Sequence, residues 1–256
     1  MNEEKEITIY THDNIKIETI VPIQHVTDIK ITREFNEHGR LELEGVLVQE
    51  KASELIFQKF EGEGITILSP DEKADYGRVM FFSGQITEIE IIHQAQFYTV
   101  KLEALSATHT LDYQPKTRSF QNKDMYFADI IRKIGEDYPH FDFRMVKNDR
   151  PIGTMKLQYE ETDWAFLRRL ATHFNTHLIA DVTCDWIPRF WFGMTLLTNK
   201  LDDVQSYQRR FDRDGYMRAK AQGLDVYEWE FEKYIVRSRD VLGLGEYAWL
   251  RIENML

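Results

Sequence analysis

The sequence predicts a mainly β protein with an α+β insert, in which two small antiparallel β-barrel modules flank an α+β domain. Three observations predict this fold class. Apolar and polar residues alternate with a period of two in the first part of the chain, apolar residues recur with helical spacing in the middle, and alternation returns near the end. Aromatic residues make up 13% of the chain, which favours strands. We expect the modules to span 1–111, 112–200 and 201–256.

The N-terminal module, residues 1–111, is expected to form the first β-barrel. Strand-like alternation occurs in short runs bounded by turn residues, at 29–32, 41–44, 86–91 and 98–105. Within the third run, Glu88 and Glu90 face one side of the strand and Ile89 and Ile91 the other, as in a sheet with one wet face.

One helix interrupts these strands. Ala52, Leu55 and Ile56 have helical spacing, and Gly62 and Gly64 follow the run. The pattern predicts a short helix over 50–60 that crosses one end of the barrel.

The middle module, residues 112–200, is expected to contain a first helix that Asn122 caps and that continues to about Tyr138, where Pro139 stops it. An apolar stripe supports this helix: Phe127, Ile130, Ile131 and Ile134.

A second helix is predicted to begin after Thr162, a favourable N-cap residue, with acidic residues where the helix dipole is positive. Phe166, Leu167 and Leu170 would form its buried face. Two strand-like runs follow, at 177–182 and 190–194. These elements make the middle module α+β.

The C-terminal module is expected to be the second β-barrel, which strands of the preceding region could complete. Residues 201–223 are charge-dense and predict a long loop. In the run 226–232, Tyr227, Trp229 and Phe231 alternate with glutamates, which predicts a strand paired with 247–250 across a glycine turn.

Composition and charge exclude several classes of protein. The 256 residues carry 32 Lys+Arg and 43 Asp+Glu, a net charge of −11, which excludes a simple basic-patch binder of polyanions. The one cysteine, Cys184, cannot form an internal disulfide, and we expect it to be a small buried residue. The most apolar stretch, 186–197, is too short and too interrupted to span a membrane. The acidic N-terminus predicts no secretory signal, so synthesis in the cytoplasm is expected.

No candidate metal site satisfies its own requirements. His173 and His177 are four residues apart, but no glutamate lies between them and the helix is expected to end there, so we interpret them as a helix-end residue and a strand residue. Asp212, Asp214 and Gly215 resemble part of a calcium loop, yet the final bidentate glutamate is absent, and a tight turn is the simpler interpretation.

The candidate catalytic groups also do not meet the requirements of the sites that they resemble. Glu160, Glu161 and Asp163 are too close in sequence to face each other across a substrate, and they fit a helix start. Gly243 and Gly245 have neither a third glycine nor a following helix, which indicates a hairpin turn and not a phosphate site. The sequence therefore predicts no catalytic residue, no cofactor and no metal, and the protein is not expected to be an enzyme.

The stretch 157–170, LQYEETDWAFLRRL, resembles the QYxESDxxFLxRL signature of one family. That family comprises the VgrG-like spike proteins of type VI secretion, the phage late control protein D and the T4-type baseplate hub. Residues 119–122 before the first helix and 176–180 after the second also resemble it. The usual glycine after the signature helix is replaced here by Asn175 or Thr176.

The resemblance implies a hub-like architecture and a structural role in a phage tail baseplate or a related contractile injection system. A homotrimeric ring would link the tail tube to a central spike that carries an OB-fold domain and a needle, with other baseplate proteins as partners and DNA only in transit. Tyr227, Trp229 and Phe231 are candidate interface residues. The signature residues would have structural roles only: Gln158, Tyr159, Glu161, Thr162, Asp163, Phe166, Leu167 and Leu170.

Two other functions remain open from the sequence. A cell-wall or glycan-binding β module would need exposed tryptophan and tyrosine platforms. A hydrolase would need two of the acidic residues to face each other, which the sequence does not arrange.

Overall fold

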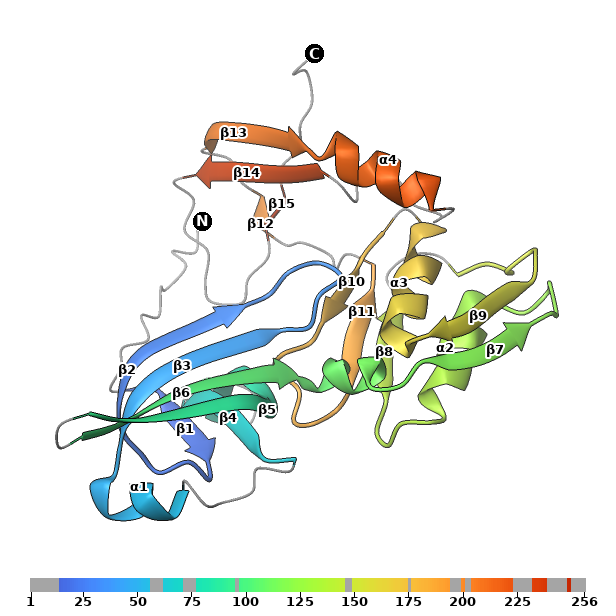
Figure 1. The fold of residues 1–256 in the computed structure, drawn as a ribbon. Helices are drawn as coiled ribbons and strands as arrows, with labels where there is room; N and C mark the ends of the chain where they lie inside the picture. The colour runs from blue at the N-terminus through green and yellow to red at the C-terminus, as the bar shows by residue number, and fades with distance from the viewer. Residues whose placement is uncertain are drawn as a thin grey trace.

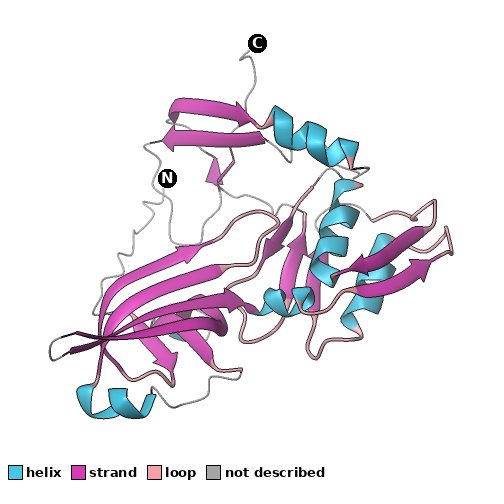
Figure 2. Ribbon diagram, in the orientation of Figure 1, coloured by secondary structure: helices cyan, strands magenta, loops and turns pink. Residues whose placement is uncertain are grey.

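The computed structural model of the chain describes residues 14–55, 62–70, 77–94, 97–145, 149–174, 176–193, 199–200, 204–222, 232–238 and 248–249. Strands predominate, and the helices gather mainly around the middle of the chain (Figure 2). The predicted mainly β fold class is confirmed.

A curled six-stranded antiparallel sheet forms the N-terminal part, with the strand order β1-β4-β5-β6-β3-β2 (Figure 1). Its strands are β1 (Lys16–Thr19), β2 (Ile23–Thr32), β3 (Arg40–Leu47), β4 (Gly64–Pro70), β5 (Arg78–Gln94) and β6 (Phe97–Ser106). All four predicted runs lie within these strands. Helix α1 (Gln49–Leu55) follows β3, as the spacing predicted for this segment.

One face of this sheet supplies the first hydrophobic core. Leu41 and Leu43 of β3 and Val100 and Leu102 of β6 are almost fully buried, whereas the residues between them are more exposed. The period-two pattern thus separates the core from the solvent. Val182, which is distant in sequence, is also part of this core.

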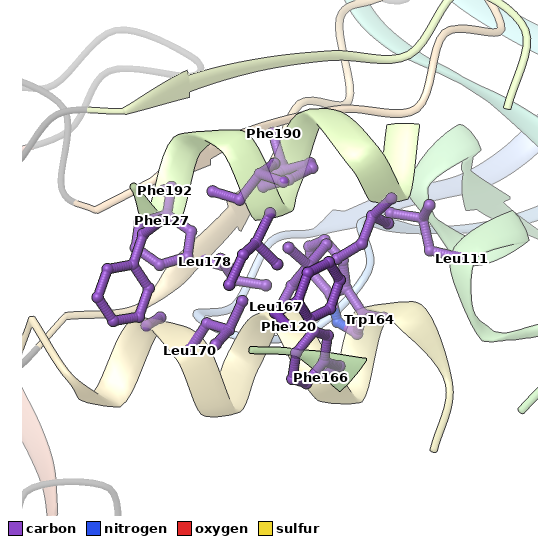
Figure 3. Packing of buried hydrophobic residues seen from close by; sticks show 14 of the residues in the cluster. Leu111, Phe120, Phe127, Trp164, Phe166, Leu167, Leu170, Leu178, Phe190 and Phe192 are labelled. Atoms are coloured by element: carbon purple, nitrogen blue, oxygen red, sulfur yellow. The ribbon is translucent and has the colours of Figure 1, made fainter. Parts of the chain in front are cut away.

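The middle of the chain builds a second core. Its elements are the 3₁₀ helix η3 (Ala107–Asp112), β7 (Lys116–Phe120), α2 (Phe127–Gly135), β8 (Asp142–Met145), β9 (Lys156–Glu161), α3 (Asp163–Thr172), β10 (Leu178–Ala180) and β11 (Arg189–Phe192). Strands β10, β11 and β8 form one sheet, and β7 pairs with β9 in a separate ribbon. Figure 3 shows Phe166, Leu167 and Leu170 of α3 pointing into this core.

Helix α2 begins later than the sequence predicted. It starts at Phe127, and Asn122 lies in a turn where its side chain accepts a hydrogen bond from the backbone N–H of Asp124. The Asp149 carboxylate accepts instead from the backbone N–H of Ala128, at 3.3 Å. A residue beyond the end of the helix therefore satisfies one backbone N–H of its first turn, a contact that local sequence cannot show.

The prediction of a long loop over 201–223 is wrong. This segment contains β13 (Val204–Phe211) and α4 (Arg213–Ala221), and the Asp212 side chain caps α4 by accepting from the backbone N–H of Gly215, at 3.0 Å. Asp212 and Gly215 thus form a helix start, in place of the predicted tight turn.

Near the C-terminus the described strands form two pairs that the sequence did not predict. Strand β14 (Glu232–Ser238) pairs with β13, and β15 (Ala248–Trp249) pairs with β12 (Asn199–Lys200) in parallel. The predicted strand 226–232 overlaps β14 only at Glu232. Tyr227, Trp229, Phe231 and the glycine turn at 243–245 lie outside the described residues. Among the described helices, none is long and apolar enough to cross a membrane.

Candidate functional site

The signature segment runs from β9 into α3, and its polar residues gather where the helix begins. Thr162 is the N-cap residue, with an extended backbone, and its Oγ1 accepts a hydrogen bond from the backbone N–H of Ala165 at 3.2 Å. This is the cap that the sequence predicted. Asp163 follows as the first helical residue, and its side chain is fully buried.

Four side chains from three other parts of the fold surround the Asp163 carboxylate. Arg118 donates to it, Tyr138 Oη donates at 2.6 Å, and Gln158 Nε2 donates at 2.8 Å. Lys116 Nζ lies 3.1 Å from Asp163 Oδ2. Burial by itself raises the pKa of Asp163, but the hydrogen bonds from Arg118, Tyr138 and Gln158 outweigh it and hold the pKa below the usual value. Asp163 is therefore a fully paired buried carboxylate.

A second carboxylate completes this group of charges. Asp137, just after α2, forms ion pairs with both Lys116, at 2.6 Å, and Arg118. Hydrogen bonds from Lys116 lower the pKa of Asp137, and burial raises the pKa of Tyr138. Lys116 and Arg118 of β7 thus face the carboxylates of Asp137 and Asp163. The two positive charges neutralise the two negative charges at a place where burial limits their solvation by water.

Other signature residues make local contacts along the same helix. Arg169 of α3 forms a bidentate ion pair with Glu161, with its shorter contact at 2.7 Å, and donates to the backbone carbonyl of Leu157 at 2.6 Å. Gln158 Nε2 also donates to the carbonyl of Glu161, at 2.9 Å. Tyr159 differs from these residues, because 65% of it is exposed.

Helix α3 also contacts the connection between β2 and β3. Trp164, which is 1% exposed, donates from Nε1 to the backbone carbonyl of Asn36 at 2.9 Å. Asn36 has a left-handed backbone (φ 66) and its side chain accepts from the backbone N–H of Leu178 at 2.9 Å. The signature helix is thereby tied to the N-terminal sheet and to β10.

A chain of polar side chains runs beside this contact. His38 Nδ1 lies 3.0 Å from Thr108 Oγ1, and His38 Nε2 lies 2.8 Å from Asp112 Oδ2. Asp112 in turn accepts a hydrogen bond from Thr162, the cap of α3. The His38 ring also packs against Trp164, with centroids 4.7 Å apart. Segments from both cores therefore meet at the start of α3.

The two histidines considered as metal ligands have separate packing environments. His173 is the C-cap residue of α3 and packs against Phe127, whereas the His177 ring stacks on Phe35 with centroids 4.9 Å apart. Within the described part of the chain, no three His, Cys, Asp or Glu side chains are grouped so that they could hold a metal ion. Burial raises the pKa of the Cys184 thiol to about 11, so the thiol is protonated at neutral pH.

The burial of His177 predicts that the free energy of unfolding depends measurably on pH. Burial lowers its pKa from 6.5 to about 4. The unfolded chain binds this proton near pH 6.5 and the folded chain only near pH 4, so protonation favours unfolding between these values. We expect His177 to lower the free energy of unfolding by up to about 3 kcal/mol as the pH falls through this window. Chemical denaturation at several pH values measures this slope.

The matched variants separate this histidine from the others. His177→Gln is expected to flatten the slope, and His93→Gln, at an exposed position, is expected to retain it. Equal slopes in both variants and the wild type would contradict the assignment.

The sequence did not indicate most partners of the signature residues. Asn36, His38, Asp112 and Arg118 belong to no motif, and they contact α3 only because the fold brings distant segments together. The single local signal was the position of Arg118 just before the segment 119–122 that resembles the family.

Comparisons with known proteins identify the family of the chain. The model of one family, described as phage tail baseplate hub (GPD), matches residues 32–174, which is more than half of the chain. The match includes the six-stranded sheet from the end of β2 onward and the whole of α3. No curated protein is similar to the chain in sequence.

Several solved structures share the fold. A type VI secretion component of E. coli, described as similar to the T4 bacteriophage tail proteins gp27 and gp5, aligns over 93% of this chain and 67% of its own, with a TM-score of 0.52 and 12% identity. The 43 kDa tail protein of prophage MuSo2 from Shewanella oneidensis aligns over 78% of this chain and 61% of its own, with a TM-score of 0.54 and 17% identity. A tail protein from Neisseria meningitidis MC58 aligns over 94% and 72%, with a TM-score of 0.50 and 10% identity.

Proposed function

Because the chain belongs to the phage tail baseplate hub family, we propose that three copies of it form a closed ring that links the tail tube to the central spike. The family makes the protein a structural tail component of a phage or a related contractile injection system. The homotrimer, the tube and spike contacts and the absence of catalytic activity are parts of the proposal.

One observation of the fold carries it furthest. At the start of α3, Trp164 donates to the Asn36 carbonyl in the connection between β2 and β3, and Thr162 is linked through Asp112 to His38 of the same connection. Hydrogen bonds therefore join the two cores in addition to the chain itself. A subunit that transmits force between a tube and a spike must resist bending between its parts. The buried Trp164 supplies part of that resistance, because opening between the two cores would leave its N–H group unpaired.

The domain division belongs to the same proposal. The division into modules at 1–111, 112–200 and 201–256 remains a prediction. It is supported by the two buried clusters, one in the curled sheet and one around α2 and α3, although Leu111 and Val182 each pack in the cluster of the neighbouring module. The interface role of Tyr227, Trp229 and Phe231 also remains a prediction. In this role the tail tube protein, a spike with an OB-fold and needle and other baseplate proteins are the partners, and DNA passes only in transit.

The solution mass of the purified chain tests the ring. Light scattering should give the mass of three subunits, alone or after addition of the tube and spike proteins, and negative-stain images of the same peak should show rings. A monomer in the presence of both partners would contradict the proposal, and binding of that monomer to isolated cell wall would favour the glycan-binding alternative.

A further inference from the structure

The outward face of the six-stranded sheet carries two rows of charged side chains that cross four strands. In the first row Glu88 of β5 lies opposite Glu103 of β6, which lies opposite Glu42 of β3 and then Lys30 of β2. The second row is formed in the same strand order by Glu90, Lys101, Glu44 and Asp28. Six of these eight side chains are acidic.

The basic residues of this face are already paired. Lys30 contacts Glu42 at 2.7 Å, Lys101 contacts Glu44 at 3.0 Å, and Arg40 contacts Glu103 at 3.2 Å. Asp28 and Glu88 form no ion pair within the described part of the chain, and three glutamates lie in direct cross-strand register. Like charges directly opposite each other destabilise a sheet. The outward face therefore carries more negative charge than would be expected if only the stability of the single subunit had to be maintained.

Helix α4 and the end of β13 have the opposite charge. Between residues 209 and 220 there are five basic and two acidic residues, in a chain whose net charge is −11. Arg210, Arg213 and Arg218 are exposed, and Asp212 is engaged as the helix cap. Residues 209–220 therefore form a basic surface in a chain whose net charge is negative.

Helix α4 lacks the buried face on which a short helix normally depends. It has nine residues, and none of them is buried. Isolated helices of this length are marginal in water, and helices in proteins depend mainly on the packing of one face. Met217 is 54% exposed, on the same side of α4 as Arg213. The helix thus presents a cationic and partly apolar side with no cover in the described structure.

We propose that α4 of one copy docks on the acidic outward face of β5, β6, β3 and β2 of a second copy. The charges of the two surfaces are complementary, and Figure 1 shows α4 far from β5 and β6 within one chain. A contact between two different patches is heterologous, and such contacts form a ring when the rotation from one subunit to the next closes the circle. This inference rests on the proposed ring and names the surfaces that would build it.

Charge reversal tests the contact on the whole chain. One variant, Glu88→Lys/Glu90→Lys, changes the sheet face, and another, Arg213→Glu/Arg218→Glu, changes the helix. The control Asp124→Lys/Glu136→Lys has the same change of charge as the sheet variant, at exposed positions elsewhere. Sedimentation equilibrium at low salt measures self-association, and circular dichroism checks that each variant is folded.

Each reversal is expected to weaken self-association at least about tenfold, because like charges across an interface repel. The variant that carries all four substitutions should regain wild-type association, and the control should not lose it. The rescue by the fourfold variant excludes unfolding as the cause.

The outcomes separate this inference from the proposed function. A wild-type trimer whose association is unchanged in both reversal variants overturns the docking and leaves the ring standing. A wild-type monomer in the presence of tube and spike overturns both. Loss of binding to duplex DNA in Arg213→Glu/Arg218→Glu, with unchanged self-association, would assign the basic segment to nucleic acid and would also overturn the docking.

Discussion

Replacement of Asp163 by asparagine is expected to lower the free energy of unfolding by about 3 kcal/mol, because removal of one partner of a buried ion pair leaves the other charge uncompensated. Among the described residues, Arg118 and Lys116 would then share one carboxylate, that of Asp137. Urea denaturation at pH 7 measures the loss. The pH matters, because a carboxylate with a lowered pKa contributes its stability above about pH 4 and loses it as the pH falls further.

Asp137→Asn is the matched control for this prediction. The Asp137 side chain is 46% exposed, so its ion pairs are screened by solvent and its replacement is expected to cost less than about 1 kcal/mol. If the two variants were equally stable, the buried position of Asp163 would have no special role in holding α3 to β7.

Truncation of Trp164 to alanine should have an effect of similar or larger size, about 4 kcal/mol, because a buried tryptophan loses its packing and leaves a cavity. Trp164 packs against Phe190 in the second core and against His38 of the connection between β2 and β3. We therefore also expect faster proteolysis within residues 33–39 of this variant than of the wild type.

Trp164→Phe separates the packing from the hydrogen bond. Phenylalanine retains most of the apolar contact but cannot donate to the Asn36 carbonyl, so a loss of about 1 kcal/mol is expected. An unchanged proteolysis rate at 33–39 in Trp164→Ala would show that α3 does not hold this connection in place.

The elements that the sequence predicted best are those whose determinants are local. Helix α3 begins at its predicted cap, Thr162. Its start was predictable because the cap residue and the apolar stripe both lie within a few neighbouring residues. The strands of the curled sheet were also predictable, since Leu41, Leu43 and their counterparts alternate with charged residues. Resemblance to a family signature then supplied the architecture that alternation alone could not.

The elements that the sequence missed depend on distant residues or on weak patterns. The first turn of α2 is satisfied by Asp149, and α4 has no apolar stripe of buried residues by which it could have been recognised. The sequence did not predict the network around Asp163 because that network also depends on residues that are distant in sequence. A carboxylate near a helix start predicts an interaction with the helix dipole, and only the fold shows that Arg118 and Tyr138 are close to it.

The position of Val182 has a consequence for the order in which the chain folds. Its side chain is fully buried in the core of the N-terminal sheet, and its carbonyl accepts a hydrogen bond from the backbone N–H of Ser83 at 2.7 Å. A Cβ atom on Gly39 would collide with it, so Val182 packs directly against a position that has no room for a side chain. During synthesis the six strands leave the ribosome well before Val182 does. The core of the N-terminal sheet therefore remains incomplete during synthesis until most of the α+β region has also been made.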